Sequence, residues 1–271
     1  MTMKTMTKTL VALLSISAYT AQAETLTLKD PAGDDNGHGA VIYPTAAIYK
    51  PGAFDLREFK LKTSGGKGTF EVKMNSKLED VWAMGSGFST QMVFVFIDTD
   101  NKPGSGFTQG LPGLNINFDP KHAWDKVVIL SPQKKSRVTS EAKIKAEKFK
   151  DAIIVPNKTK GKGKKISAKV DLKDIAASSP KSWHYQVVVQ SNEGFPAKTD
   201  LLTRRINEYE GQHRFGGGHD MDCDPHVIDM LAGQAKGDKS EAAAQHKQLT
   251  YQCSEEGQSL KMAQVEMIKA L

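Results

Sequence analysis

The chain has 271 residues, of which 39% are hydrophobic and 25% are charged, and its formal net charge is +6. This length suffices for a domain of about 200 residues with a large core. The positive charge is modest, and its densest run, Lys158 to Lys165, lacks an aromatic side chain on which a base would stack, so we expect a solvated loop and no nucleic-acid partner. The sequence contains no G-x-S-x-G, H-E-x-x-H or P-loop motif, which argues against enzymes of those classes.

The first 23 residues have the pattern of a signal peptide. Lys4 and Lys8 flank the start of an apolar stretch, and Ala21-Gln22-Ala23 forms a small-x-small cleavage site before Glu24. We therefore expect residues 1–23 to be removed and the mature protein to be periplasmic or secreted. Because the removed segment contains two Lys and no acid, the charge falls from +6 to +4. The apolar stretch is too short to span a bilayer and no later segment is long enough, so we expect no membrane-spanning segment.

The mature N-terminus begins with an alternating strand, 25–29, and continues into a loop, 30–39, that is rich in Asp, Asn and Gly. Within this loop Asp30, Asp34, Asp35 and Asn36 offer the hard oxygen atoms that Ca²⁺ binds. No Glu follows at the position that closes an EF-hand loop. The same residue types also form Asx turns with their own backbone. Calcium binding and turn formation therefore both remain open for this loop.

The most apolar stretch, Met92 to Ile97, predicts a strand that is buried on both faces. Before it, the segments 54–61 and 70–74 alternate around a glycine-rich turn at 65–68, which predicts a hairpin. The buried strand ends at a second oxygen-rich loop with Asp98, Asp100 and Asn101. Paired carboxylates do acid–base chemistry in some enzymes, but two on one strand end are better suited to sharing a cation. This loop is thus a second candidate calcium site.

Further strands are predicted at 123–130, 137–144, 145–155, 165–170 and 183–190, with one or two helical turns at 171–177. Short strands separated by turns, without a long amphipathic helix between them, favour a mainly β protein. We predict an antiparallel β-sandwich over residues 24–232 that folds without the rest of the chain.

The remaining residues, 233–271, are predicted to form a C-terminal tail. Its segment 259–271 carries a helical stripe, which predicts an amphipathic helix docked on the sandwich. The stripe consists of Leu260, Ala263, Met267, Ile268 and Leu271.

Cys223 and Cys253 are the two cysteines of the chain, and in an exported protein such a pair predicts a disulfide. The bond would close a loop of about thirty residues and contribute roughly 3 kcal/mol in the chain-entropy model. Several His and Asp residues lie near Cys223 in the sequence. They are consistent with a metal site of mixed nitrogen and oxygen ligands or with a polar loop around the disulfide, and both interpretations stay open. These residues are His213, His219, His226, Asp220, Asp222 and Asp224.

Five segments of the sequence resemble the C-terminal domain of glucodextranase and of related amylopullulanases. They are DPAGDDNGHGAVIYPT (30–45), PGAFDLREFKL (51–61), GFSTQMVFVFIDTD (87–100), LPGLNINFDPKHAWDKVVIL (111–130) and FGGGHDMDCDPHVIDML (215–231). They occur in the family's order and cover roughly residues 25–232. The resemblance implies a β-sandwich that is not catalytic and that binds polysaccharide or the cell surface. The broader group includes carbohydrate-binding modules and the haem-b-binding γ subunit of ethylbenzene dehydrogenase.

Two functional hypotheses combine this resemblance with the residues described above. The first is an exported, non-catalytic module, stabilised by Ca²⁺, whose partner is a polysaccharide, a cell-surface glycan or a partner enzyme. Some of its aromatic side chains would then form a sugar-stacking platform; the candidates are Trp82, Trp124, Trp183, Tyr43, Tyr49 and Tyr185. The alternative is a periplasmic haem-b electron carrier in which a Met is one axial ligand. Met84, in a loop before the buried strand, is a better candidate for that ligand than Met92.

Overall fold

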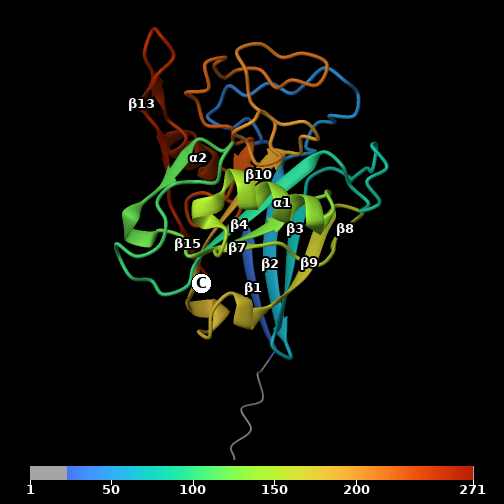
Figure 1. Ribbon diagram of the computed structural model, residues 1–271, viewed down its shortest axis with the longest axis vertical. Coiled ribbons are helices and arrows are strands. Elements are labelled where there is room, and N and C mark those ends of the chain that lie inside the picture. The colour runs from blue at the N-terminus through green and yellow to red at the C-terminus, as the bar shows by residue number, and fades with distance from the viewer. Residues whose placement is uncertain (1–22, 271) are drawn as a thin grey trace, which may run out of the picture.

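Alternating apolar and polar residues near the N-terminus form three strands of the first of two large β-sheets (Figure 1). The computed structural model describes residues 23–270, so the predicted signal peptide lies outside the described residues except for its last position. The first sheet is antiparallel throughout, in the order β1-β2-β3-β9-β8. Its strands are β1 (Glu24–Lys29), β2 (Leu56–Ser64), β3 (Lys67–Met74), β9 (Lys165–Asp171) and β8 (Thr159–Lys162). The β2–β3 pair confirms the predicted hairpin.

The second sheet is built around the apolar run, which forms strand β4. Its order is β11-β10-β4-β6-β7, and β15 pairs with one end of β10. All of these pairs are antiparallel except β6–β7, which is parallel. The strands are β4 (Gln91–Asp98), β6 (Lys126–Leu130), β7 (Ile153–Ile154), β10 (His184–Ser191), β11 (Asp229–Met230) and β15 (Ile268–Lys269).

The two faces of β4 belong to two different hydrophobic cores. Val93, Val95 and Ile97 point into the core between the sheets, where they meet apolar residues of β2 and β3. Phe94 and Phe96 point the other way, into a second core on the outer face of the sheet. Every residue of β4 is therefore buried, which confirms the prediction of a strand buried on both faces. The two sheets packed around a shared core confirm the predicted β-sandwich.

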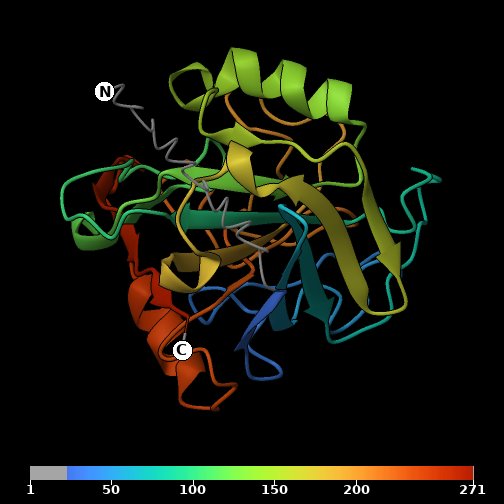
Figure 2. The ribbon, with the colours of Figure 1, turned by 90° about the horizontal axis from the view of Figure 1, so that it is seen from below.

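The outer core is covered by a layer that the sequence analysis did not foresee. Figure 2 shows helix α1 (Lys135–Lys145) lying across the second sheet, on the side away from β1–β3. The one-turn helix η2 (Glu147–Phe149) follows it. The strands predicted at 137–144 and 145–155 are thus wrong apart from the short β7. The segment is rich in Lys, Glu and Ala, which favour helix, and burial of Val138 and Ala142, four residues apart, is enough to hold one helical face on the core.

The C-terminal residues complete this outer layer. The predicted helix at 259–271 is wrong, because residues 259–269 form short strands. Leu271, the last residue of the predicted stripe, lies outside the described residues. β14 (Ala263–Val265) runs parallel to β5 (Ile116–Phe118), while β12 (Gln252–Cys253) pairs with β13 (Ser259–Lys261). The strand β5 and the first residues of β10 offer backbone hydrogen-bond partners to the tail. Pairing with them outweighs the weak helical stripe. The tail's helix lies earlier, at α2 (Glu241–Gln248).

Short elements complete the described chain. The one-turn helices are η1 (Pro120–His122), η3 (Leu172–Asp174) and η4 (Pro180–Ser182), and η3 matches the helical turn expected after residue 171. The basic run at 158–165, expected to be a loop, forms β8 and the turn into β9, because the free edge of β9 offers it backbone partners. Within residues 23–270, no helix is both long and apolar enough to cross a membrane.

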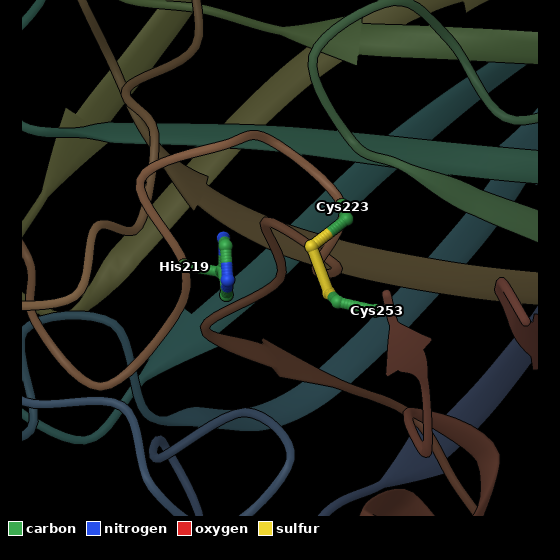
Figure 3. Close-up of side chains that lie close together, drawn as sticks. All are labelled: His219, Cys223 and Cys253. Carbon is green, nitrogen blue, oxygen red and sulfur yellow. A yellow bond between two sulfur atoms is a disulfide. The ribbon is translucent and has the colours of Figure 1, made fainter. Parts of the chain in front are cut away.

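The disulfide is present and ties the tail to the preceding loop. Cys223 and Cys253 are bonded, with Cα atoms 5.8 Å apart (Figure 3). The bond joins residue 223 to strand β12, so it holds the tail against the segment that leads into β11.

From the sequence we predicted that residues 24–232 fold without the tail. Because Leu249 is fully buried in the outer core, we now expect the tail to unfold together with the sandwich. Leu249→Ala should lower the free energy of unfolding by about 2–5 kcal/mol. Leu260→Ala is the matched control: Leu260 is 62% exposed, so its loss should change stability by less than about 0.5 kcal/mol. Urea denaturation measures both changes. If both substitutions changed the free energy of unfolding by the same small amount, the tail would not contribute to the stability of the sandwich.

Candidate functional site

The first oxygen-rich loop delivers two of its carboxylates to a buried cluster. The chain leaves β1 at Lys29, and the next residue, Asp30, is only 1% exposed. One carboxylate oxygen from each of Asp30, Asp34 and Asp229 lies within 4.8 Å of the others. Asp229 opens strand β11 beside β10, so the cluster joins the N-terminal loop to the second sheet. We call Asp30, Asp34 and Asp229 the carboxylate cluster.

Several oxygen atoms of this cluster have no hydrogen-bond partner among the described residues. Both oxygens of Asp30 and Oδ1 of Asp34 are buried and unpaired. Asp229 is better satisfied, because its Oδ2 accepts from the amide of Leu56 at 2.6 Å. Buried charged groups without partners are costly, so these oxygen atoms need either protons or a cation.

The pKa values of the cluster reflect this cost. Burial, and then the charges of neighbouring carboxylates, raise the pKa of Asp30 and of Asp229 well above the usual range. Burial is also the main cause that raises the pKa of Asp34 to about 7. The Arg57 guanidinium lowers the pKa of Asp30, but this effect is the smallest of those acting on it. The described residues thus supply too little positive charge to balance the carboxylates of the cluster.

The other two predicted ligands of this loop point elsewhere. Asp35 accepts a hydrogen bond from the hydroxyl of Tyr43, and Oδ1 of Asn36 lies 2.9 Å from Nε2 of His246. Asp55, which was not predicted, lies beside the cluster: its Oδ2 accepts from the amide of Gly33 at 2.8 Å, while its Oδ1 is buried and unpaired. Sequence reasoning also missed Asp229. Its signal is a lone acid within an apolar run, Val-Ile-Asp-Met-Leu.

The second oxygen-rich loop uses most of its oxygen atoms for its own turn. Oδ1 of Asp98 accepts from the amides of Asp100 and Asn101, at 3.2 and 2.8 Å. Oδ1 of Asp100 accepts from the amide of Lys102 and the hydroxyl of Ser105. One carboxylate oxygen from each of Asp98, Asp100 and Asp125 nevertheless lies within 4.8 Å of the other two. The loop is therefore an Asx turn with residual negative charge.

The His and Asp residues near Cys223 do not converge on one point. His226 is fully buried, with Nε2 2.6 Å from Oδ1 of Asp222. Burial works to lower the pKa of His226, but its bonds to Asp222 and Asp224 outweigh burial and raise that pKa to about 9. His219 lies beside Cys223 and Cys253 (Figure 3), but both sulfur atoms are in the disulfide and offer no thiolate. The arrangement is an ion-pair network around a disulfide.

A pocket of about 480 Å³ lies where β4 begins and β10 ends. It is lined by two aromatic rings and by charged and amide side chains, among them Trp82, Phe195, Arg137, Glu193, Arg204 and Asn192. Phe195 is 94% exposed, which is unusual for so large an apolar side chain. We call this the Trp82 pocket.

The polar groups of the Trp82 pocket are partly fixed. Arg204 forms an ion pair with Glu193 at 2.8 Å, yet its Nε is buried and without a partner among the described residues. Arg137 donates to the carbonyl of Gly194. The pocket thus combines exposed aromatic surface with oriented donors and acceptors.

The remaining aromatic candidates for a sugar platform lie elsewhere. Trp124, Trp183 and Tyr185 are fully buried in the cores. Tyr49 is also buried and Tyr43 is largely so, packed around Phe54. Phe195 was not predicted; no periodicity marks it, because it lies in a loop.

The two methionines considered as haem ligands differ in access. Met84 lines the Trp82 pocket together with His213. Met92 is fully buried in the outer core and reaches no open site.

The chain matches a known protein family over most of its length. The family described as the C-terminal, SLH-like binding module of glucodextranase matches residues 25–265, which confirms the suspected resemblance and extends it past residue 232. Comparison with curated proteins gives no significant match. Because this match covers most of the chain, the chain belongs to the family of C-terminal, SLH-like binding modules of glucodextranase.

Proposed function

We propose that the chain is an exported, non-catalytic module that binds a carbohydrate in the Trp82 pocket. The observation that carries the proposal is that one pocket pairs the half-buried ring of Trp82 and the exposed ring of Phe195 with charged side chains. These are Arg137, Glu193 and Arg204. Its volume, about 480 Å³, is in the range of small-ligand sites. Export is supported by the signal-peptide pattern of residues 1–23 and by the disulfide, which oxidising compartments favour.

The chemistry of the pocket suits a sugar. The C–H groups on one face of a pyranose ring pack on an aromatic ring, which provides apolar contact at a small entropic cost. Hydroxyl groups at the ring edge both donate and accept hydrogen bonds, so they match arginine, carboxylate and amide groups together. The enzyme in the family's name is glucodextranase, and dextran is therefore our first probe, beside pullulan and cell-wall polysaccharide.

We further propose that Ca²⁺ occupies the carboxylate cluster. Asp30, Asp34 and Asp229 bring unpaired oxygen atoms together in a buried place, which is the ligand type and charge that Ca²⁺ prefers. A bound cation would offset both the repulsion between the carboxylates and their desolvation. The Asp30 loop is favoured over the Asp98 loop because in the latter turn amides already occupy Oδ1 of Asp98.

One observation favours the haem alternative: Met84 and His213, two residue types that serve as axial ligands, line the same pocket. The remaining lining argues against it, because two arginines, a glutamate and amides suit a polar ligand better than an apolar macrocycle. The absorption spectrum of protein purified from its native compartment separates the two. A Soret band would replace the carbohydrate proposal with the haem alternative.

Phe195→Ala should weaken binding of the recognised polysaccharide about tenfold or more, because exposed aromatic anchors dominate such interfaces. Affinity gel electrophoresis with dextran, pullulan and cell-wall polysaccharide measures the change. Tyr209→Ala is the matched control, since Tyr209 is an exposed aromatic residue outside the pocket lining. If the parent protein is retarded by none of these polysaccharides, or if Phe195→Ala and Tyr209→Ala behave alike, the pocket is not a carbohydrate site.

Adding Ca²⁺ to carefully chelated protein should raise its melting temperature. At a hundredfold excess over Kd, a ligand specific for the native state adds about 2.7 kcal/mol, or roughly 5–10 °C for a protein of this size. Asp30→Asn should abolish the gain, and its apo form should be at least as stable as the apo parent because one buried charge is gone. Asp100→Asn, in the other loop, should retain the gain. If only Asp100→Asn lost the calcium-dependent rise in melting temperature, the calcium site would lie in the second loop instead.

A further inference from the structure

Two histidines face Asp98 at the end of the second sheet opposite the Trp82 pocket. His184, the first residue of β10, is the direct cross-strand partner of Asp98, the last residue of β4, so their side chains lie on the same face of the sheet. His122 ends the one-turn helix η1 that follows β5. Its ring stacks on that of His184, with the centroids 4.0 Å apart and the planes inclined by 22°.

The three side chains direct their donor atoms toward one point. Nδ1 of His122 lies 2.9 Å from Oδ2 of Asp98, and Nδ1 of His184 lies 3.9 Å from the same oxygen. Donor atoms of all three residues fall within 4.8 Å of one another. Ligands of a tetrahedral zinc ion, each about 2.0–2.1 Å from the metal, are about 3.4 Å apart, and the two observed distances lie on either side of that value.

His184 has no other use for its Nδ1. The residue is 9% exposed, and this nitrogen is buried without a hydrogen-bond partner among the described residues. At 3.9 Å the carboxylate of Asp98 is too far away for a hydrogen bond. A buried polar atom that is left unpaired in this way calls for a missing partner, and a cation placed between the two rings and the carboxylate satisfies it.

We propose that Asp98, His122 and His184 form a binding site for a divalent transition-metal ion, which we identify by its chemistry as zinc. Two imidazoles and one carboxylate are the donor set of such ions, whereas Ca²⁺ prefers oxygen atoms alone. The site is separate from the carboxylate cluster, and the two sites differ in the metal they favour.

The surroundings support a bound cation. Asp100 and Asp125 bring further negative charge close to Asp98. Lys269, opposite His184 on β15, acts in the other direction, but its side chain is exposed to solvent.

The geometry of the ligands is fixed by the fold, as metal sites require. Oδ1 of Asp98 is held by the amides of Asp100 and Asn101, which leaves Oδ2 free to face the histidines. His122 has a side chain that is 35% exposed, so the site is open on that side. Three protein ligands with an open fourth position leave room for a water molecule or for a ligand from a binding partner.

This site is independent of the Trp82 pocket. Strand β4 has eight residues, so its two ends are about 25 Å apart at the usual rise per residue. Substitutions at His122 should therefore leave polysaccharide binding unchanged.

The test is a calorimetric titration of the whole, disulfide-bonded protein with Zn²⁺, with Ca²⁺ present in saturating amount to fill the carboxylate cluster. The parent should bind one Zn²⁺, and His122→Ala should weaken that binding at least tenfold. The matched control is His219→Ala, which removes a histidine from the loop beside the disulfide and should bind Zn²⁺ like the parent. Failure of the parent to bind Zn²⁺, or equal binding by His122→Ala and the parent, would overturn the proposal.

A second measurement needs no substitution. Diethyl pyrocarbonate acylates accessible imidazoles, and mass spectrometry locates the label. Zn²⁺ should protect His122 and leave the labelling of His219 unchanged. Protection of His219 with full labelling of His122 would place the metal elsewhere and contradict the assignment.

Discussion

Strand β4 has no solvent-exposed face, and the rest of the structure is arranged to keep it so. One face is covered by the first sheet, which explains the alternating pattern of β2 and β3. The other face carries Phe94 and Phe96, whose burial requires a third layer. Helix α1, the β5–β14 pair and Leu249 of the tail supply that layer. Since burial of a large apolar side chain contributes about 1.5–3 kcal/mol, uncovering this face would expose several such residues at once.

Covering both faces of the sheet leaves its two ends as the accessible places for polar chemistry. At the end where β4 begins, the segment before β4 and the loops after β6 and β10 bring together Trp82, Gln133 and Asn192. At the end where β4 stops, Asp98 and His184 meet as cross-strand partners. Loops at sheet ends tolerate many residue types because they are not required to pack in the core. Each end can therefore carry its own binding site while the sheet between them remains unchanged.

The sequence predicts the elements whose signal is local. The run Met92–Ile97 and the hairpin at 56–74 follow from apolar pattern and glycine turns alone. Helix α1 was missed because it has few apolar residues to mark a helical face, and only Val138 and Ala142 are buried within it. The tail strands were missed for a different reason: β14 forms because β5 offers it a partner, and that partner lies far away in the sequence.

The same distinction applies to the sites. Asp30 and Asp34 were found because they share a loop, whereas Asp229 joins them only through the pairing of β11 with β10. His122 and His184 carry no motif at all and become a pair only when η1 packs against the start of β10. Composition can identify a loop rich in ligands, but residues from separate elements need the fold to bring them together.

The tail also connects to the carboxylate cluster, which gives it a role beyond covering the outer core. Gln245 of α2 is fully buried, and its side-chain amide donates to the carbonyl oxygens of Asp34 and Gly37, at 2.6 and 3.2 Å. Its carbonyl oxygen accepts from the amide of Met230, next to Asp229, at 2.9 Å. One side chain from the tail therefore fixes the backbone on both sides of the cluster. The calcium site that we propose and a docked α2 both need Asp34 and Asp229 in these positions. The proposal therefore predicts that cation binding and tail docking are thermodynamically linked, because each lowers the cost of ordering the other.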